Sequence, residues 1–158
     1  MDTVSSGILS LDLELGIGGL PKNKITEISG PPDSSKSSFI FNLIKANADC
    51  TIAYIDMDNR INLSYLSQMG IDTESLIITQ PTSVEQMIEI VSSLLDTKAI
   101  DIIIIDSIAS IISRDEKHQP ITASNNAGTI SDTIKKLSSI KIWIQERRMN
   151  LLLGQICF

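Results

Sequence analysis

A lysine and a serine stand side by side after a short loop, immediately before a segment expected to be helical. Lys36 and Ser37 belong to the run Gly30, Pro31, Pro32, Asp33, Ser34, Ser35, Lys36, Ser37 and Ser38. Its spacing fits a phosphate-binding loop, in which backbone N–H groups and the positive end of the following helix attract phosphate oxygens. In such a loop Lys36 would neutralise the β and γ phosphates of a nucleotide. The Ser37 hydroxyl would hold Mg²⁺.

One position of this loop departs from the pattern, because Ser35 stands where the second glycine belongs. If that position requires a positive φ, a residue other than glycine costs roughly 1–2 kcal/mol. Phosphate binding by a lysine and Mg²⁺ can exceed this cost, so we expect nucleotide binding with reduced affinity. The alternative is a turn, rich in serine and proline, that precedes a helix and binds nothing.

Acidic residues follow two apolar segments further along the chain. The run Ile102–Ile105 is wholly aliphatic and leads into Asp106, and such an acid at the end of a central strand helps to hold Mg²⁺. Asp56 and Asp58 end another apolar segment, where a carboxylate could activate a water molecule against the γ-phosphate. The alternative for this pair is two solvated acids at the end of a strand.

The elements that must position these residues alternate between strand and helix. Strands are expected at 25–29, 51–56, 76–79, 102–105 and 150–155, and helices at 9–15, 39–48, 61–69, from Ser83 onward, and at about 128–148. Ser83 and Gln86 have the spacing of a capping box. This alternation predicts an α/β fold, with a mostly parallel sheet covered by helices on both faces.

Composition sets the remaining limits. The chain has 158 residues and a net charge of −6, which suits one domain and argues against a surface that grips nucleic acid everywhere. Cys50 and Cys157 lack metal-ligand spacing and are expected to be reduced thiols. The N-terminus lacks a basic region followed by an apolar run, and the apolar runs are short. We therefore expect a cytoplasmic protein without a membrane partner.

Several segments together resemble the RecA recombinase family. They are SGILSLD at 6–12, LGIGGLP at 15–21, ITEISGP at 25–31, YID at 54–56 and IDS at 105–107. The resemblance runs over essentially the whole chain and is strongest from residue 6 to residue 106. It implies the RecA-like fold of P-loop ATPases, as one core domain over residues 1–158, with ATP and Mg²⁺ as ligands.

The resemblance also implies roles for individual residues. Lys36 and Ser37 would hold the phosphates and Mg²⁺. Asp58 falls where the family places its catalytic glutamate, so the general base would be one methylene shorter and hydrolysis slower. Tyr65 matches the tyrosine that stacks on adenine, and Asn62 lies at a polar position near the base. Gln155 matches the glutamine that senses the γ-phosphate and passes the signal to the DNA loops.

Segment 114–126 corresponds to the first DNA-binding loop of the family. There Arg114, Lys117 and His118 are the residues able to meet the phosphates of single-stranded DNA.

Compared with the family, the chain begins at the core and ends soon after Gln155. We therefore expect the N-terminal oligomerisation helix and the C-terminal part to be absent, and Leu152 and Phe158 to lie near an exposed sheet edge. That edge could pair with a full-length recombinase or a second copy. The alternative is that the chain's own helices cover the apolar run of Leu151, Leu152 and Leu153.

Two functions remain open at this stage. The first is an ATP-binding protein of DNA recombination or repair with a weak, DNA-dependent ATPase activity. The second is a degenerate module that works through protein contacts, for example as a recombinase regulator. A small-molecule kinase fits poorly, because no arginine-rich lid follows Asp106.

Overall fold

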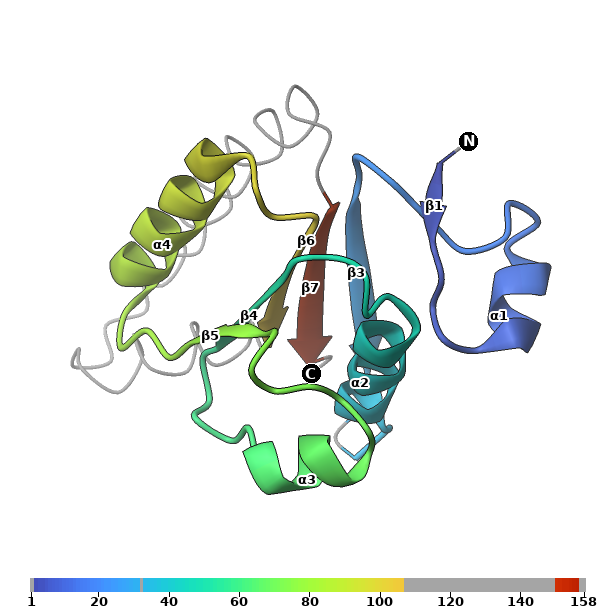
Figure 1. Cartoon of the computed structure of the whole chain (residues 1–158), viewed down its shortest axis with the longest axis horizontal. Helices are drawn as coiled ribbons and strands as arrows, with labels where there is room; N and C mark the ends of the chain where they lie inside the picture. Colours follow the sequence, from blue (N-terminus) through green and yellow to red (C-terminus); the bar gives the residue numbers. More distant parts are fainter. Residues whose placement is uncertain (1, 32, 107–149, 157–158) are drawn as a thin grey trace, which may run out of the picture.

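The elements of the computed structural model follow the expected alternation (Figure 1). The structure describes residues 2–31, 33–106 and, as backbone, 150–156. The helices are α1 (Leu9–Glu14), α2 (Lys36–Ala46), α3 (Leu63–Gln68) and α4 (Val84–Thr97). The strands are β1 (Thr3–Val4), β2 (Leu20–Pro21), β3 (Ile25–Gly30), β4 (Ile52–Asp56), β5 (Ile77–Thr79), β6 (Ile102–Asp106) and β7 (Asn150–Ile156). The predicted helix at 128–148 and the predicted loop at 114–126 lie outside the described residues.

Five of the strands form one parallel sheet in the order β3-β7-β6-β4-β5. Parallel pairing brings the carboxyl ends of the strands to the same edge, where ligands bind in open α/β sheets. The register pairs Asp56 with Asp106, so the two acids that end β4 and β6 lie side by side. On the other side of β6, Gln155 of β7 pairs with Ser29, one residue before the loop that begins at Gly30.

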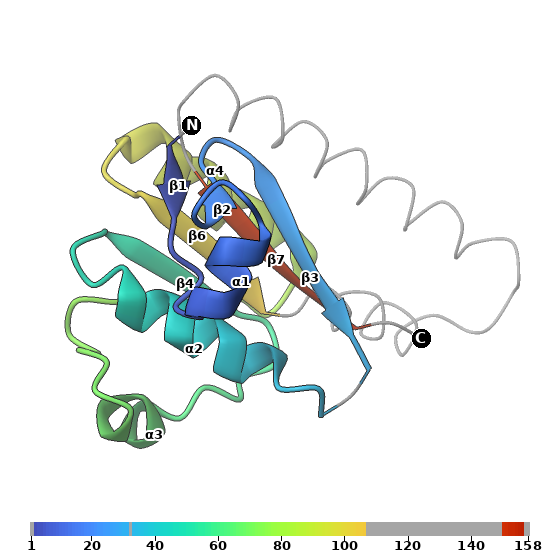
Figure 2. The same cartoon turned by 90° about the vertical axis from the view of Figure 1, so that its right-hand side faces the viewer.

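Two hydrophobic clusters cover the two faces of this sheet, as expected for a parallel sheet buried on both sides. Side chains along β4 and β6 alternate between the clusters. On one face Ala53, Ile55, Ile103 and Ile105 pack with α4 residues Met87, Val91 and Leu95. On the other Ile52, Tyr54, Ile102 and Ile104 pack with α2 residues Ile40, Leu43 and Ile44. Figure 2 views the molecule from the α2 side, with α4 behind the sheet.

The predicted cap of α4 is present with one difference. The Ser83 side chain accepts a hydrogen bond from Gln86 N at 3.2 Å, as in a capping box. The Gln86 Oε1 atom accepts in turn from Thr82 N at 2.8 Å and from Thr82 Oγ1 at 3.1 Å. The reciprocal bond therefore goes to the residue before the N-cap.

The N-terminal segment contains a small antiparallel pair, β1 with β2, that sequence analysis did not predict. Strands of two residues carry no hydrophobic period. Asp12 organises the turn by accepting hydrogen bonds from Ser5 Oγ at 2.7 Å and Ser6 N at 2.9 Å. Asn47, the C-cap residue of α2, donates to the Ser5 carbonyl at 2.8 Å, which ties this segment to the core.

The structure corrects the expectation for the last strand. Leu152 does not lie at a sheet edge, because β7 is inserted between β3 and β6 and Leu152 pairs with both Thr26 and Ile104. Within the described sheet the edge strands are β3 and β5. Phe158 lies outside the described residues. In the part of the chain that the structure describes, no helix is both long and apolar enough to span a bilayer.

Candidate nucleotide-binding site

The loop between β3 and α2 closes around the Lys36 ammonium group. Lys36 Nζ donates hydrogen bonds to Gly30 O at 3.0 Å, Pro31 O at 2.7 Å and Ser34 Oγ at 3.2 Å. The strand supplies the first acceptor and the loop the other two, while the lysine itself is the first residue of α2. A positive charge is thus held at the centre of the loop, where the sequence predicted it. Pro32 lies outside the described residues.

The backbone of this loop confirms that position 35 is in the left-handed region. Ser35 has φ 61° and ψ 27°, and it serves as the N-cap of α2 without a side-chain capping bond. A non-glycine residue in this conformation costs roughly 1–2 kcal/mol. Asp33 also has a positive φ, 60°. At Gly30 the constraint is space, because a Cβ there would lie 2.7 Å from Ser34 Oγ.

The acid at the end of β6 meets the first turn of α2. Ser37 Oγ donates to Asp106 Oδ2 at 3.3 Å, and the buried Tyr54 hydroxyl donates to the same oxygen at 2.7 Å. Sequence analysis paired Ser37 with Asp106, and the structure brings them together. Tyr54 was not predicted from the sequence as a member of the site.

Burial changes the acid–base behaviour of this tyrosine. Tyr54 is 2% exposed. Burial is the larger cause that raises the pKa of the Tyr54 hydroxyl above its ordinary value, and the negative charge of Asp106 is the next. The hydroxyl therefore stays protonated at neutral pH and acts as a hydrogen-bond donor.

The two acids that end β4 have different environments. Asp56 is 3% exposed and accepts hydrogen bonds from Ile61 N at 3.0 Å, Gln80 Nε2 at 3.0 Å and Asp58 N at 3.2 Å. These bonds organise the segment that follows the strand. Asp58 is half-buried and lines the cavity described below. Both acids line the cavity, but Asp56 is the more buried of the two and its carboxylate also holds the segment that carries Asp58.

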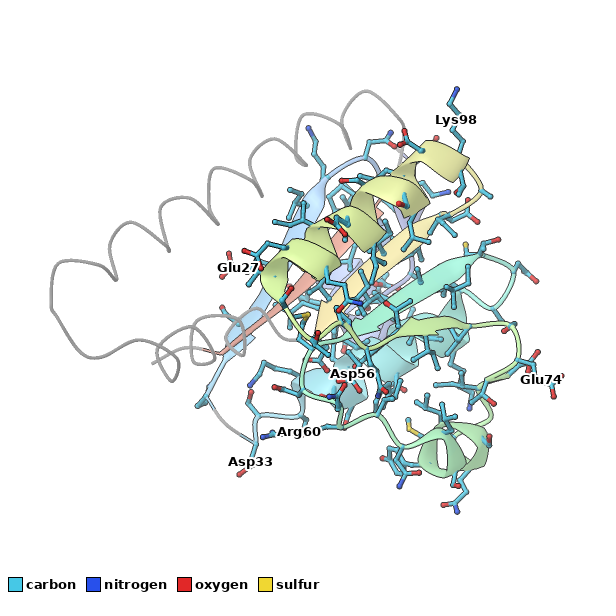
Figure 3. All side chains as sticks on the ribbon, turned by 90° about the vertical axis from the view of Figure 1, so that its left-hand side faces the viewer. Glu27, Asp33, Asp56, Arg60, Glu74 and Lys98 are labelled. Atoms are coloured by element: carbon cyan, nitrogen blue, oxygen red, sulfur yellow. The ribbon has the colours of Figure 1, made fainter. Side chains whose placement is uncertain are left out.

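A cavity of about 450 Å³ lies between the loop, the strand ends and α3. Its lining includes ten residues singled out from the sequence: Asp33, Ser35, Lys36, Ser37, Ser38, Asp56, Asp58, Asn62, Tyr65 and Asp106. It also includes four that were not: Phe41, Tyr54, Arg60 and Ile61. Figure 3 shows Asp33, Asp56 and Arg60 at the same end of the molecule. Gly30, Pro31 and Ser34 contribute to the site by accepting hydrogen bonds from Lys36 Nζ.

Three aromatic rings run along one wall of the cavity. The Phe41 ring lies 6.1 Å from Tyr65 in an edge-to-face arrangement and 6.4 Å from Tyr54. Tyr65 remains 47% exposed, so much of its surface is open to a ligand. Asn62 begins α3, and its side chain accepts from Tyr65 N at 3.1 Å. Asn62 therefore caps the helix that presents the tyrosine.

Comparison with known proteins shows which family this chain resembles. A family model for the RecA N-terminal domain matches residues 1–156. Protein RecA of Bdellovibrio bacteriovorus is 33% identical over 163 residues, which is 96% of this chain and 43% of that protein. Protein RecA of Clostridium botulinum (strain Eklund 17B) is 37% identical over 161 residues, 94% of this chain and 45% of that protein. The mitochondrial DNA repair protein recA homolog of Dictyostelium discoideum is 33% identical over 165 residues, 96% of this chain and 36% of that protein.

The chain belongs to the RecA family. It spans less than half the length of these curated relatives. The RecA match covers the loop at Lys36, the acid at Asp106 and strand β7, so the family assignment made from the residues is confirmed.

The remaining RecA-like positions are only partly within the described structure. The backbone of Gln155 lies on β7 beside Ser29, which places it near the phosphate loop. Arg114, Lys117 and His118 lie outside the described residues. Sequence reasoning missed Tyr54 as a site residue, although it lies two positions before Asp56 on a strand and so shares a face with that acid.

Proposed function

We propose that this RecA-family chain binds ATP with Mg²⁺ and hydrolyses it slowly, within a protein of DNA recombination or repair. The observation that carries the proposal is the meeting of Lys36, Ser37 and Asp106 at one cavity. The names of the relatives, Protein RecA and a mitochondrial DNA repair protein, support the biological setting.

Lys36 and the start of α2 would bind the phosphates. The three oxygens that Lys36 Nζ now contacts are neutral loop acceptors. Charged phosphate oxygens make stronger hydrogen bonds to an ammonium group, so β and γ phosphates would replace some of these contacts. The helix α2 has 11 residues, and its N-terminal N–H groups point toward the same anion.

Ser37 and Asp106 fit Mg²⁺ by the chemistry of their oxygens. This ion prefers oxygen ligands and is usually held by one or two carboxylates together with substrate phosphates and water. Among the described residues no cluster of three or more histidine, cysteine or acidic side chains is placed to hold a metal alone. The site therefore suits an ion that arrives with the nucleotide, and it would neutralise charge that develops on the phosphates.

Tyr65, Asn62 and Asp58 would complete the site. Tyr65 exposes ring surface on which adenine can stack, and Asn62 beside it offers polar atoms to the base. Asp58 would act as the general base for the attacking water, with the shorter carboxylate slowing the step. Gln155, near the loop, would sense the γ-phosphate.

A degenerate module that acts through protein contacts is the second candidate. Its support is the strained Ser35 backbone in the loop and the aspartate at position 58. Release of inorganic phosphate from ATP decides between the two. The first candidate predicts slow release that requires Mg²⁺ and is lost in Asp58→Asn, whereas absence of any release above that variant would favour the second.

Binding of single-stranded DNA is a further part of the proposal. Arg114, Lys117 and His118 would contact backbone phosphates, so affinity should fall as salt increases. The double substitution Arg114→Ala and Lys117→Ala should weaken binding and reduce its salt dependence. Fluorescence anisotropy of a labelled oligonucleotide would measure both effects, and binding that does not respond to salt would contradict the assignment.

A further inference from the structure

We propose that Tyr54 is a positioning residue for divalent-cation binding, which acts by fixing the orientation of the Asp106 carboxylate. This inference rests on the proposed function, since it concerns the cation that would accompany the nucleotide. Tyr54 is neither part of the phosphate loop nor one of the acidic residues of the site, and the inference gives it a role of its own.

The geometry connects Tyr54 to one particular oxygen. The Tyr54 hydroxyl donates to Asp106 Oδ2 at 2.7 Å, and Ser37 Oγ approaches the same atom at 3.3 Å. Two donors on one carboxylate oxygen oppose rotation of the group, because rotation would break both bonds. Asp106 is therefore oriented before a cation binds.

The tyrosine can hold the carboxylate because it is itself held. Its backbone lies on β4, paired with Ile104 of β6, two residues before Asp106 on the neighbouring strand. Its ring is 2% exposed and lies 6.4 Å from the Phe41 ring of α2. The shortness of the Tyr54–Asp106 bond, compared with the Ser37–Asp106 bond, indicates that the tyrosine provides the stronger restraint.

A purely structural role would have a different consequence. If Tyr54 only filled the core, removing its hydroxyl would either change nothing at the site or disturb nucleotide binding whether or not a cation is present. If Tyr54 acts through Asp106, removing its hydroxyl weakens ATP binding only when Mg²⁺ is present. The dependence of ATP affinity on Mg²⁺ therefore separates the two roles.

The test is Tyr54→Phe, which removes one oxygen and keeps the ring. ATP affinity is measured by calorimetry with excess Mg²⁺ and again with EDTA. We expect the Kd with Mg²⁺ to rise about tenfold, the usual scale for losing a hydrogen bond to a charged group, and the Kd in EDTA to stay within about twofold. An unchanged Kd in Mg²⁺, or an equal rise in both conditions, would overturn the inference.

A double-mutant cycle with Asp106→Asn tests the path of the effect. If Tyr54 acts through Asp106, adding Tyr54→Phe to Asp106→Asn should produce little further loss of Mg²⁺-dependent affinity. Independent, multiplying losses would show that Tyr54 acts elsewhere and would overturn the inference. Circular dichroism and thermal unfolding establish that each variant is folded at the assay temperature.

Ser93→Ala provides a matched control, because it removes an exposed hydroxyl from α4, on the opposite face of the sheet. It should leave both Kd values unchanged. A folded wild-type protein that binds no ATP would overturn the proposed function and this inference together. Wild-type binding strengthened by Mg²⁺, with the same strengthening in Tyr54→Phe, would overturn only the inference.

Discussion

Ser37 and Asp106 are separated by 69 positions in the chain, yet Ser37 Oγ lies 3.3 Å from Asp106 Oδ2. The contact joins the first turn of α2 to the carboxyl end of β6 across the edge of the sheet. Both side chains are thus set toward one cavity by regular elements and not by loops alone. Catalytic and binding groups held on helices and strands need little rearrangement when a ligand binds.

Relief of the strained backbone at position 35 should strengthen nucleotide binding. Ser35→Gly places glycine at φ 61°, where it avoids the cost of roughly 1–2 kcal/mol that a side chain brings. We expect a higher melting temperature and a lower Kd for ATP, measured by thermal unfolding with and without Mg²⁺ and ATP. An unchanged affinity would show that this position is not the weak point of the loop.

Lys98→Gly is the control for that substitution. Lys98 also lies in the left-handed region, with φ 56°, but it caps the C-terminus of α4. Glycine there should raise the melting temperature by a similar physical effect, worth about 1 kcal/mol. The Kd for ATP should not change, so the pair separates relief of strain from an effect on the site.

The length of the acid at position 58 should control turnover. Asp58→Glu extends the carboxylate by one methylene, and we expect ATP hydrolysis to increase several-fold, because the attacking water is better aligned. Asp58→Asn should lower hydrolysis by roughly 100-fold, the scale of losing a general base. Steady-state phosphate release measures both. A glutamate variant slower than the wild type would argue that the backbone at this position is already adjusted to aspartate.

Loss of the buried acid at position 56 should destabilise the fold and loosen the segment that carries Asp58. Asp56→Ala leaves the part-buried N–H groups of Asp58 and Ile61 without their acceptor, at a cost toward the lower end of roughly 1–3 kcal/mol for each group. Urea unfolding measures the loss. Asp101→Ala is the comparison: Asp101 is exposed at the opposite end of the sheet and accepts one bond, from Thr51 N at 2.8 Å. If both variants lost the same stability, Asp56 would have no special role.

The exposed tyrosine at the entrance of α3 should contribute stacking energy to the base. Tyr65→Ala should weaken ATP binding by roughly 1–3 kcal/mol, the range for loss of base–aromatic stacking. Tyr65→Phe keeps the ring and should bind ATP nearly as the wild type does. Competition with inorganic triphosphate, which lacks a base, adds a check, because its affinity should be the same in all three proteins.

Much of this fold and part of the site were accessible from the sequence. The continuous aliphatic run of β6 and the apolar stripe of α4 are strong signals, so the bounds of β6 and the start of α4 were predicted within one residue. The spacing around Lys36 predicted a phosphate-binding loop, and the structure shows that Ser35 has the positive φ that the sequence analysis considered as a condition. The two-residue strands β1 and β2 were missed, because elements so short have no period to detect.

The arrangement of the site residues in space could not be predicted from the sequence. The strand order, with β7 inserted between β3 and β6, cannot be deduced from local patterns, and it is the reason that Leu152 is not at an edge. Tyr54 resembled an ordinary core residue of a strand. Only the structure, which pairs it with Ile104, shows that its hydroxyl reaches Asp106 two residues further along β6. From the strand pattern alone Asp56 and Asp58 looked equivalent. Both line the cavity, and only the structure shows that Asp56 is buried with three hydrogen bonds whereas Asp58 is half-buried.

The nucleotide site at the Lys36 loop can be tested by a calorimetric titration of ATP with Mg²⁺ into the wild type, Lys36→Ala and Lys45→Ala. Lys45 is an exposed lysine in the last turn of the same helix, so it controls for loss of charge. We predict saturable binding that Lys45→Ala retains and that Lys36→Ala weakens by about 100-fold, the scale of losing charge-assisted hydrogen bonds. Absence of binding by the folded wild type, or equal affinities for all three proteins, would contradict the assignment of a nucleotide site to this loop.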